Sequence, residues 1–182
     1  MDLGLFLIRA VVGSLLAGHG IQKLVGRLGG YGLAGTGGHL EALGLRPGKL
    51  YAALAGTAEL TGGVLFVIGL ATPFAALLIA STMFVAARTD HAGKGLWIFN
   101  GGAEYVVTVA AIVLAVVIMG PGEWSLDGAF GLQVSGVVDG VATLTLSVIG
   151  ASAILAFRNR AEVATSADDP SGSPDMTEHP AM

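Results

Sequence analysis

The stretch Leu3–Val25, LGLFLIRAVVGSLLAGHGIQKLV, decides the fold of this chain. It is long enough to cross a bilayer, since a spanning helix needs about 20 mostly apolar residues. Yet it contains Arg9, His19 and Lys23, which lie within about 80° of one another around a helix and alternate with glycines. A charge facing lipid at mid-bilayer costs roughly 2.5–3.5 kcal/mol, so we expect Arg9 to face protein or trapped water.

The composition of the whole chain agrees with a membrane environment. Of its 182 residues, 53% are hydrophobic and only 12% are charged, whereas a soluble domain carries about 25% charged residues. Several other apolar runs also reach spanning length, and they are continuous rather than alternating, which disfavours a β-barrel. The sequence therefore predicts an all-α membrane protein with the lipid bilayer as its first partner.

Charge and cysteine content exclude several function classes. The chain has no cysteine, so thiolate catalysis, disulfides and Cys-ligated clusters are excluded. The net charge of −4 arises from residues 161–182, which hold five acidic residues and no Lys or Arg. The remaining body has nine basic and eight acidic residues and no basic patch, so we expect no nucleic-acid partner.

The apolar runs predict an antiparallel four-helix transmembrane bundle plus a fifth C-terminal span. The expected helices are residues 3–25, 50–69, 73–87, 98–119 and 137–157, with Thr72 as the N-cap of the third helix. Accordingly, we divide the chain into a membrane core (1–128), an additional transmembrane helix (129–160) and a disordered acidic tail (161–182).

Basic residues predict the orientation. All the basic residues between the helices and at the C-terminus fall on one side of the expected bundle: Lys23, Arg27, Arg46, Lys49, Arg88, Lys94, Arg158 and Arg160. The positive-inside rule then places the N-terminus outside and the C-terminus in the cytoplasm.

Ionisable groups inside the expected spans are the candidate site residues. Glu59 lies amid small residues that let helices approach closely, and its depth permits a pair with Arg9. Lys23 and Glu104 lie at a similar depth, with His19 between the two carboxylates. A purely structural role is also open: Arg9 and Glu59 as an inert packing pair, Lys23 extending to the headgroups, and Glu104 at the interface.

Other cofactors have little support. The remaining histidines fall outside the spans, so haem b is not expected. There is no Glu-x-x-His or other metal-ligand cluster, and no Gly-x-Gly-x-x-Gly following a strand, so neither metal nor nucleotide is expected. A quinone headgroup suits the pattern, because its carbonyls accept hydrogen bonds from Arg or His while a carboxylate relays protons.

The ordered set of motifs then resembles a known family. Arg9 is followed by HGIQKL with His19 and Lys23, AELTGG with Glu59, GLATP, Glu104 and GPGEWSLD. Together these resemble the DoxX family of small bacterial four-helix membrane proteins over residues 3–127. The resemblance implies a bacterial plasma membrane location and a component of a membrane redox system, such as a thiosulfate:quinone oxidoreductase subunit or a quinone or catechol detoxification protein.

Our hypothesis from the sequence is a quinone-linked oxidoreductase component. Arg9 and His19 would orient a quinone carbonyl, Glu59 would relay protons, and Lys23 and Glu104 would hold the inner end of the site. Glu59 and His19 are thus the candidate catalytic residues, and all five are candidate quinone-binding residues. No side chain here carries electrons, so a redox role requires quinone or a soluble or membrane redox partner protein. The alternatives are a proton or small-molecule transporter and a non-catalytic scaffold for soluble redox enzymes.

Overall fold

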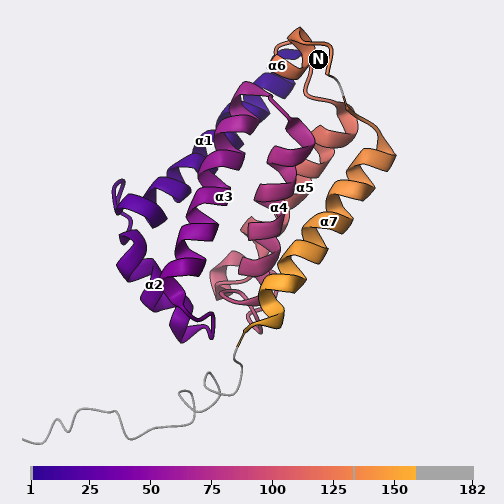
Figure 1. Cartoon of the computed structure of the whole chain (residues 1–182). Helices are drawn as coiled ribbons and strands as arrows, with labels where there is room; N and C mark the ends of the chain where they lie inside the picture. Colours follow the sequence, from indigo (N-terminus) through magenta and orange to yellow (C-terminus); the bar gives the residue numbers. More distant parts are fainter. Residues whose placement is uncertain (1, 133, 159–182) are drawn as a thin grey trace, which may run out of the picture.

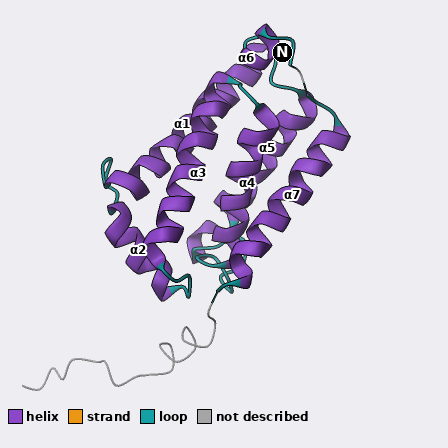
Figure 2. Ribbon diagram, viewed as in Figure 1, coloured by secondary structure: helices purple, strands orange, loops and turns teal. Residues whose placement is uncertain are grey.

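The computed structural model describes residues 2–132 and 134–158, and every regular element in those residues is a helix (Figures 1 and 2). The α-helices are α1 (Asp2–Val25), α2 (Gly32–Ala42), α3 (Gly48–Ile68), α4 (Thr72–Arg88), α5 (Glu104–Met119), α6 (Leu126–Ala129) and α7 (Val137–Ala156). A short 3₁₀ helix, η1 (Ile98–Asn100), precedes α5. The all-α prediction is confirmed for this part of the chain; the predicted disordered tail, 161–182, lies outside the described residues.

Three of these helices are candidate membrane spans by length and apolar composition: α1, α3 and α7. Helices α4 and α5 are also apolar but shorter, at 17 and 16 residues. Large apolar side chains cover the outside of the molecule: Val11 is 58% exposed, Leu54 51% and Val141 56%. Apolar surface on several helices at once is what a bilayer would cover.

Helices α1, α3, α4, α5 and α7 run side by side along the length of the molecule (Figure 1). Helix α4 packs against α3, α5 and α7, and α1 makes its largest contact with α3. Glycines allow that contact: a Cβ at Gly13 would lie 2.6 Å from the carbonyl oxygen of Gly63, and one at Gly20 would lie 2.6 Å from that of Gly56. The small-residue face expected around Glu59 is therefore the surface on which α1 packs.

The apolar core lies among α1, α3, α4 and α5. It is built from Leu16, Phe66, Ile79 and a valine stripe on α5 that includes Val113 and Val116, all of them fully buried. The valines recur at about one helical turn, so a single face of α5 packs inward.

Two helix ends differ from the sequence prediction. Helix α5 begins at Glu104 rather than at residue 98, because Gly101 has a positive φ of 71° and ends the 3₁₀ turn η1. Thr72 is the first residue of α4 and not its N-cap, which is Ala71 without a side-chain cap. Asp127 of α6 supplies the cap instead, accepting hydrogen bonds from the backbone N–H groups of Ala71 (2.7 Å) and Thr72 (2.9 Å).

Candidate ligand-binding site

Lys23 and Glu59 form an ion pair between α1 and α3. The Lys23 Nζ donates to both carboxylate oxygens of Glu59. Glu59 is only 3% exposed, whereas the Lys23 side chain is 31% exposed. Gly56, one turn before Glu59, leaves space for Lys23: a Cβ there would lie 3.2 Å from the Cβ of Lys23. Glu59 is therefore paired with Lys23 and not with Arg9, and the pairs Arg9–Glu59 and Lys23–Glu104 do not form.

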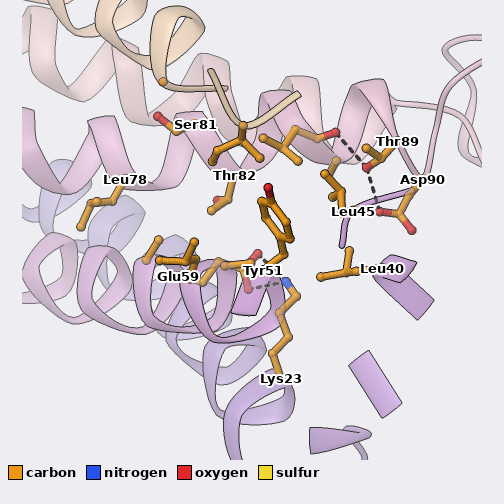
Figure 3. Close-up of a pocket in the computed structure, with 17 residues that line it drawn as sticks. Lys23, Leu40, Leu45, Tyr51, Glu59, Leu78, Ser81, Thr82, Thr89 and Asp90 are labelled. Carbon is orange, nitrogen blue, oxygen red and sulfur yellow. Dashed lines mark hydrogen bonds and ion pairs between the residues drawn. The ribbon is translucent and has the colours of Figure 1, made fainter. Parts of the chain in front are cut away.

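A cavity of about 310 Å³ lies beside this ion pair. Helix α3 forms one wall, α4 another, and Gly150 and Ile154 of α7 a third. Helices α3 and α7 each pack on α4, and neither packs extensively on the other. Most lining atoms belong to apolar side chains, with Lys23 and Glu59 at one edge (Figure 3). Cavities of this size and character commonly bind small molecules.

Tyr51, Ser81, Thr82 and Thr89 add hydroxyl groups to the polar lining of the cavity. The Thr82 hydroxyl donates to the carbonyl of Ile79 at 2.8 Å, and that of Ser81 donates weakly to the carbonyl of Ser147 at 3.4 Å. Tyr51 projects its hydroxyl into the cavity toward Thr82 (Figure 3), and that hydroxyl has no hydrogen-bond partner in the described part of the chain. It is free to donate to a ligand.

Sequence reasoning did not single out Tyr51. The signal was present: Tyr51, Ala55 and Glu59 follow one another at intervals of four residues, so they share a face of α3.

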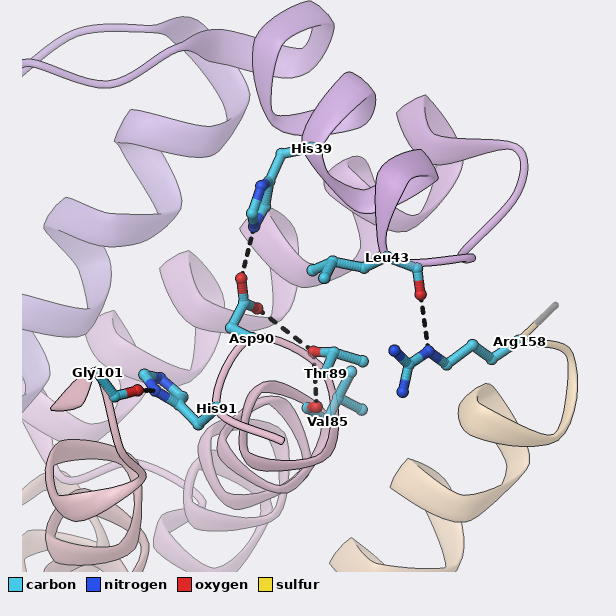
Figure 4. Close-up of polar contacts among 8 residues, drawn as sticks. All are labelled: His39, Leu43, Val85, Thr89, Asp90, His91, Gly101 and Arg158. Atoms are coloured by element: carbon cyan, nitrogen blue, oxygen red, sulfur yellow. Dashed lines mark hydrogen bonds and ion pairs between the residues drawn. The ribbon is translucent and has the colours of Figure 1, made fainter. Parts of the chain in front are cut away.

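The end of the cavity away from α6 is lined by α2, the α2–α3 connection and the loop after α4. Leu40 and Leu45 line it there together with Thr89 and Asp90. Figure 4 shows His39 of α2 reaching Asp90, whose other carboxylate oxygen accepts from the Thr89 hydroxyl at 3.3 Å. Polar contacts thus hold α2 to the end of α4.

Arg9 lies at the opposite end of α1, away from the cavity. It is fully buried, and its Nη2 donates to the backbone carbonyl of Trp124. Its guanidinium occupies the place where a side chain at Gly69 would begin. The Nε and Nη1 atoms have no hydrogen-bond partner among the described residues, and Asp127 is the nearby opposite charge. Arg9 therefore joins α1 to the end of α3 and to the segment around α6.

His19 and Glu104 also lie outside the cavity lining. The Nδ1 of His19 is 2.9 Å from the Oε1 of Gln22, and its ring meets the edge of Tyr105 with the centroids 6.2 Å apart. The carboxylate of Glu104 accepts a hydrogen bond from the backbone N–H of Ile98 at 3.0 Å, which ties η1 to the start of α5. Of the five predicted residues, the structure brings Lys23 and Glu59 together at the cavity and places the other three elsewhere.

No metal centre is evident in residues 2–132 and 134–158, where no group of three or more His, Asp or Glu side chains is placed to hold an ion. The described polar groups at the cavity are the Lys23–Glu59 ion pair, the Asp90 carboxylate and side-chain hydroxyls. Such groups bind an organic ligand by hydrogen bonds.

The helices and their apolar exterior define a multi-pass α-helical membrane protein. Within that class, the DoxX family model matches residues 4–92, which include α1 to α4, and the chain belongs to the DoxX family through this segment. The resemblance seen in the sequence motifs is thus confirmed over residues 4–92, whereas its later part, with Glu104 and GPGEWSLD, lies outside the match. No curated protein and no solved structure matches the chain.

Proposed function

We propose that the cavity beside Lys23 and Glu59 binds a quinone headgroup, and that the protein is a quinone-interacting component of a redox system in the bacterial plasma membrane. The observation that carries this proposal is an apolar cavity of about 310 Å³ with an ion pair on its wall and an unpartnered hydroxyl inside it. A quinone needs an apolar space for its ring and donors for its carbonyl oxygens. Bound there, it would supply the two-electron chemistry that no side chain in this chain supplies.

The donors fit the two carbonyls of such a ring. Lys23 lies at one edge of the cavity, and the Tyr51 hydroxyl projects into its interior (Figure 3). Glu59 fixes the position of the Lys23 ammonium and is the nearest carboxylate able to exchange a proton with it. We therefore assign carbonyl recognition to Lys23 and Tyr51, and proton exchange to Glu59. His19 and Glu104 make structural contacts outside the cavity lining, and Arg9 joins helix ends away from the cavity.

Membrane topology forms part of the proposal. We infer that α1, α3, α4 and α5 cross the bilayer as an antiparallel bundle, with α7 as a fifth span, the N-terminus outside and the C-terminus in the cytoplasm. Apolar helices of 16 and 17 residues lie near the lower limit for spanning, which local thinning of the bilayer accommodates.

Quinone titration of the purified protein tests the binding role. Tyr51→Phe removes one donor, so we expect the affinity for a short-chain quinone to fall roughly two- to tenfold. Tyr105→Phe is the matched control, because the hydroxyl of Tyr105 is buried without a partner and does not line the cavity. Glu59→Gln should weaken binding at least as much, with Glu104→Gln as its control. Absence of saturable binding, or equal affinity in all four variants, would refute the assignment.

A proton pathway is the second candidate function, and the position of Lys23 favours it. Lys23 lines the cavity and also a surface groove of about 560 Å³ formed with Gln22, Tyr31 and His39. It therefore lies between the buried Glu59 and the surface of the molecule. In sealed vesicles containing this protein alone, a pathway predicts proton flux that Glu59→Gln abolishes and Glu104→Gln leaves intact. No flux above that of empty vesicles would exclude it.

A further inference from the structure

A second groove, of about 450 Å³, lies between α4 and α7. Phe84 and Arg88 of α4 line it on one side, and Val148, Ser152 and Leu155 of α7 are among the residues on the other. The α7 residues facing this groove differ from Gly150 and Ile154, which face the cavity. From Val148 to Ala156 the groove follows α7 for about 12 Å.

Two basic residues lie near the end of the groove at Arg88: Arg88 lines the groove, and Arg158 contacts its backbone carbonyl. Arg88 is the last residue of α4 and is exposed, and its guanidinium forms no ion pair with any described residue. Arg158 donates from Nε to the carbonyl of Leu43 at 2.7 Å and from Nη1 to the carbonyl of Arg88 at 2.8 Å. Figure 4 shows Arg158 directed at Leu43. Both partners of Arg158 are neutral carbonyls, so its charge is not cancelled there.

The described carboxylate closest to Arg88 in the sequence is engaged elsewhere. Asp90 follows Arg88 by two residues, but its oxygens contact His39 and the Thr89 hydroxyl (Figure 4). The groove thus combines an apolar floor with the Arg88 guanidinium at one end and a free side-chain hydroxyl, that of Ser152, along its length, while Arg158 lies next to Arg88 outside the lining.

We propose that this groove is a binding site for an anionic phospholipid, with the phosphate at Arg88, next to Arg158, and an acyl chain along α4 and α7. The charge of the site selects an anionic headgroup, because each basic residue near a membrane surface adds about fivefold to the affinity for anionic lipid. The apolar length of the groove selects a lipid over a free phosphate. Basic pockets between transmembrane helices commonly bind such headgroups.

Lipid titration of the full-length, delipidated protein, followed by native mass spectrometry, tests the proposal. We expect phosphatidylglycerol to bind at least fivefold more tightly than phosphatidylcholine. Arg88→Gln should reduce phosphatidylglycerol affinity about fivefold, while Arg27→Gln, an exposed basic residue outside the groove, should change it less than twofold. Equal affinity for the two lipids, or an equal loss in both variants, would overturn the proposal.

Two further measurements distinguish the contribution of the lipid headgroup from that of the acyl chain. Ser152→Phe fills the groove and should lower phosphatidylglycerol binding, whereas Ala153→Phe, at the next and exposed position of α7, should not. Inorganic phosphate at the same concentration should not displace the lipid. If phosphate displaces it fully, the acyl chain has no role, and if Ser152→Phe changes only the oligomeric state, the groove is a contact between copies of the chain. Either result would refute the lipid site.

Discussion

The glycine contact between α1 and α3 leads to a prediction about Gly20. A Cβ at Gly20 would lie 2.5 Å from the backbone nitrogen of Leu60 and 2.6 Å from the carbonyl oxygen of Gly56. Ordinary contact is about 3.5 Å, so Gly20→Ala must separate the two helices locally by roughly 1 Å. Both obstructing atoms belong to backbone, which cannot rotate away. We expect the substitution to destabilise the protein by about 1–3 kcal/mol, as overpacking does.

Gly18 provides a matched control on the same helix. A Cβ at Gly18 meets only the Cδ1 of Leu28, at 3.9 Å, which is ordinary contact. Alanine is the better helix former by about 0.8–1.0 kcal/mol, so Gly18→Ala should be neutral or stabilising. Of the two glycine-to-alanine changes on α1, only the one at Gly20 is therefore expected to destabilise the protein.

Thermal unfolding in mild detergent measures the difference. For a chain of this size 1 kcal/mol shifts the midpoint by about 2–4 °C, so Gly20→Ala should lower Tm by roughly 2–12 °C. Gly18→Ala should leave Tm unchanged or raise it by a few degrees. If Gly20→Ala unfolds at or above the temperature of Gly18→Ala, the close approach of α1 and α3 is not present in the folded protein.

Two further predictions concern the buried charges. Lys23→Met leaves the carboxylate of Glu59 buried without its partner, so we expect the free energy of unfolding to fall by about 3 kcal/mol. Adding Glu59→Leu removes the unpaired carboxylate and should restore most of the unfolding temperature. A double variant no more stable than Lys23→Met would contradict the pairing. Gly69→Ala and Gly29→Ala both place alanine at a positive φ (64° and 78°), but only the side chain at position 69 collides with the guanidinium of Arg9. Gly69→Ala should therefore lower Tm by several degrees more than Gly29→Ala, and equal losses would show that Arg9 does not occupy that space.

Much of the helical framework was predictable from the sequence because long apolar runs have few alternatives. The runs at 3–25, 50–69 and 137–157 agree with α1, α3 and α7 to within about two residues. The start of α5 was predicted wrongly because it depends on the positive φ of Gly101, which a hydropathy pattern does not reveal. The cap of α4 was missed for another reason: Asp127 lies 55 residues beyond Thr72 in the sequence.

The sequence predicted which side of each helix carries the candidate site residues, but not which residues of α1 and α3 lie at the same level along the helix axes. A helical projection correctly turned Arg9, Lys23 and Glu59 toward the protein interior, yet it gave no register between α1 and α3. The contacts of Gly13 with Gly63 and of Gly20 with Gly56 fix an antiparallel register that brings Glu59 opposite the segment 17–20 of α1. Arg9 is then about 12 Å or more away along the axis. Lys23 is closer, and its long side chain reaches the carboxylate.

The pairing of Lys23 with Glu59 constrains what the neighbouring cavity can bind. A cation and an anion in contact leave this edge of the apolar cavity with no net charge. A neutral ligand can accept a hydrogen bond from Lys23 or Tyr51 without adding an uncompensated charge to a region where an unpaired ion is costly. An anionic ligand would have to compete with Glu59 for the ammonium and would leave one carboxylate unpaired in the interior. The same reasoning predicts ligands of different charge for the cavity and for the groove between α4 and α7. Arg88 and Arg158 have no carboxylate partner among the described residues, so the groove favours an anion.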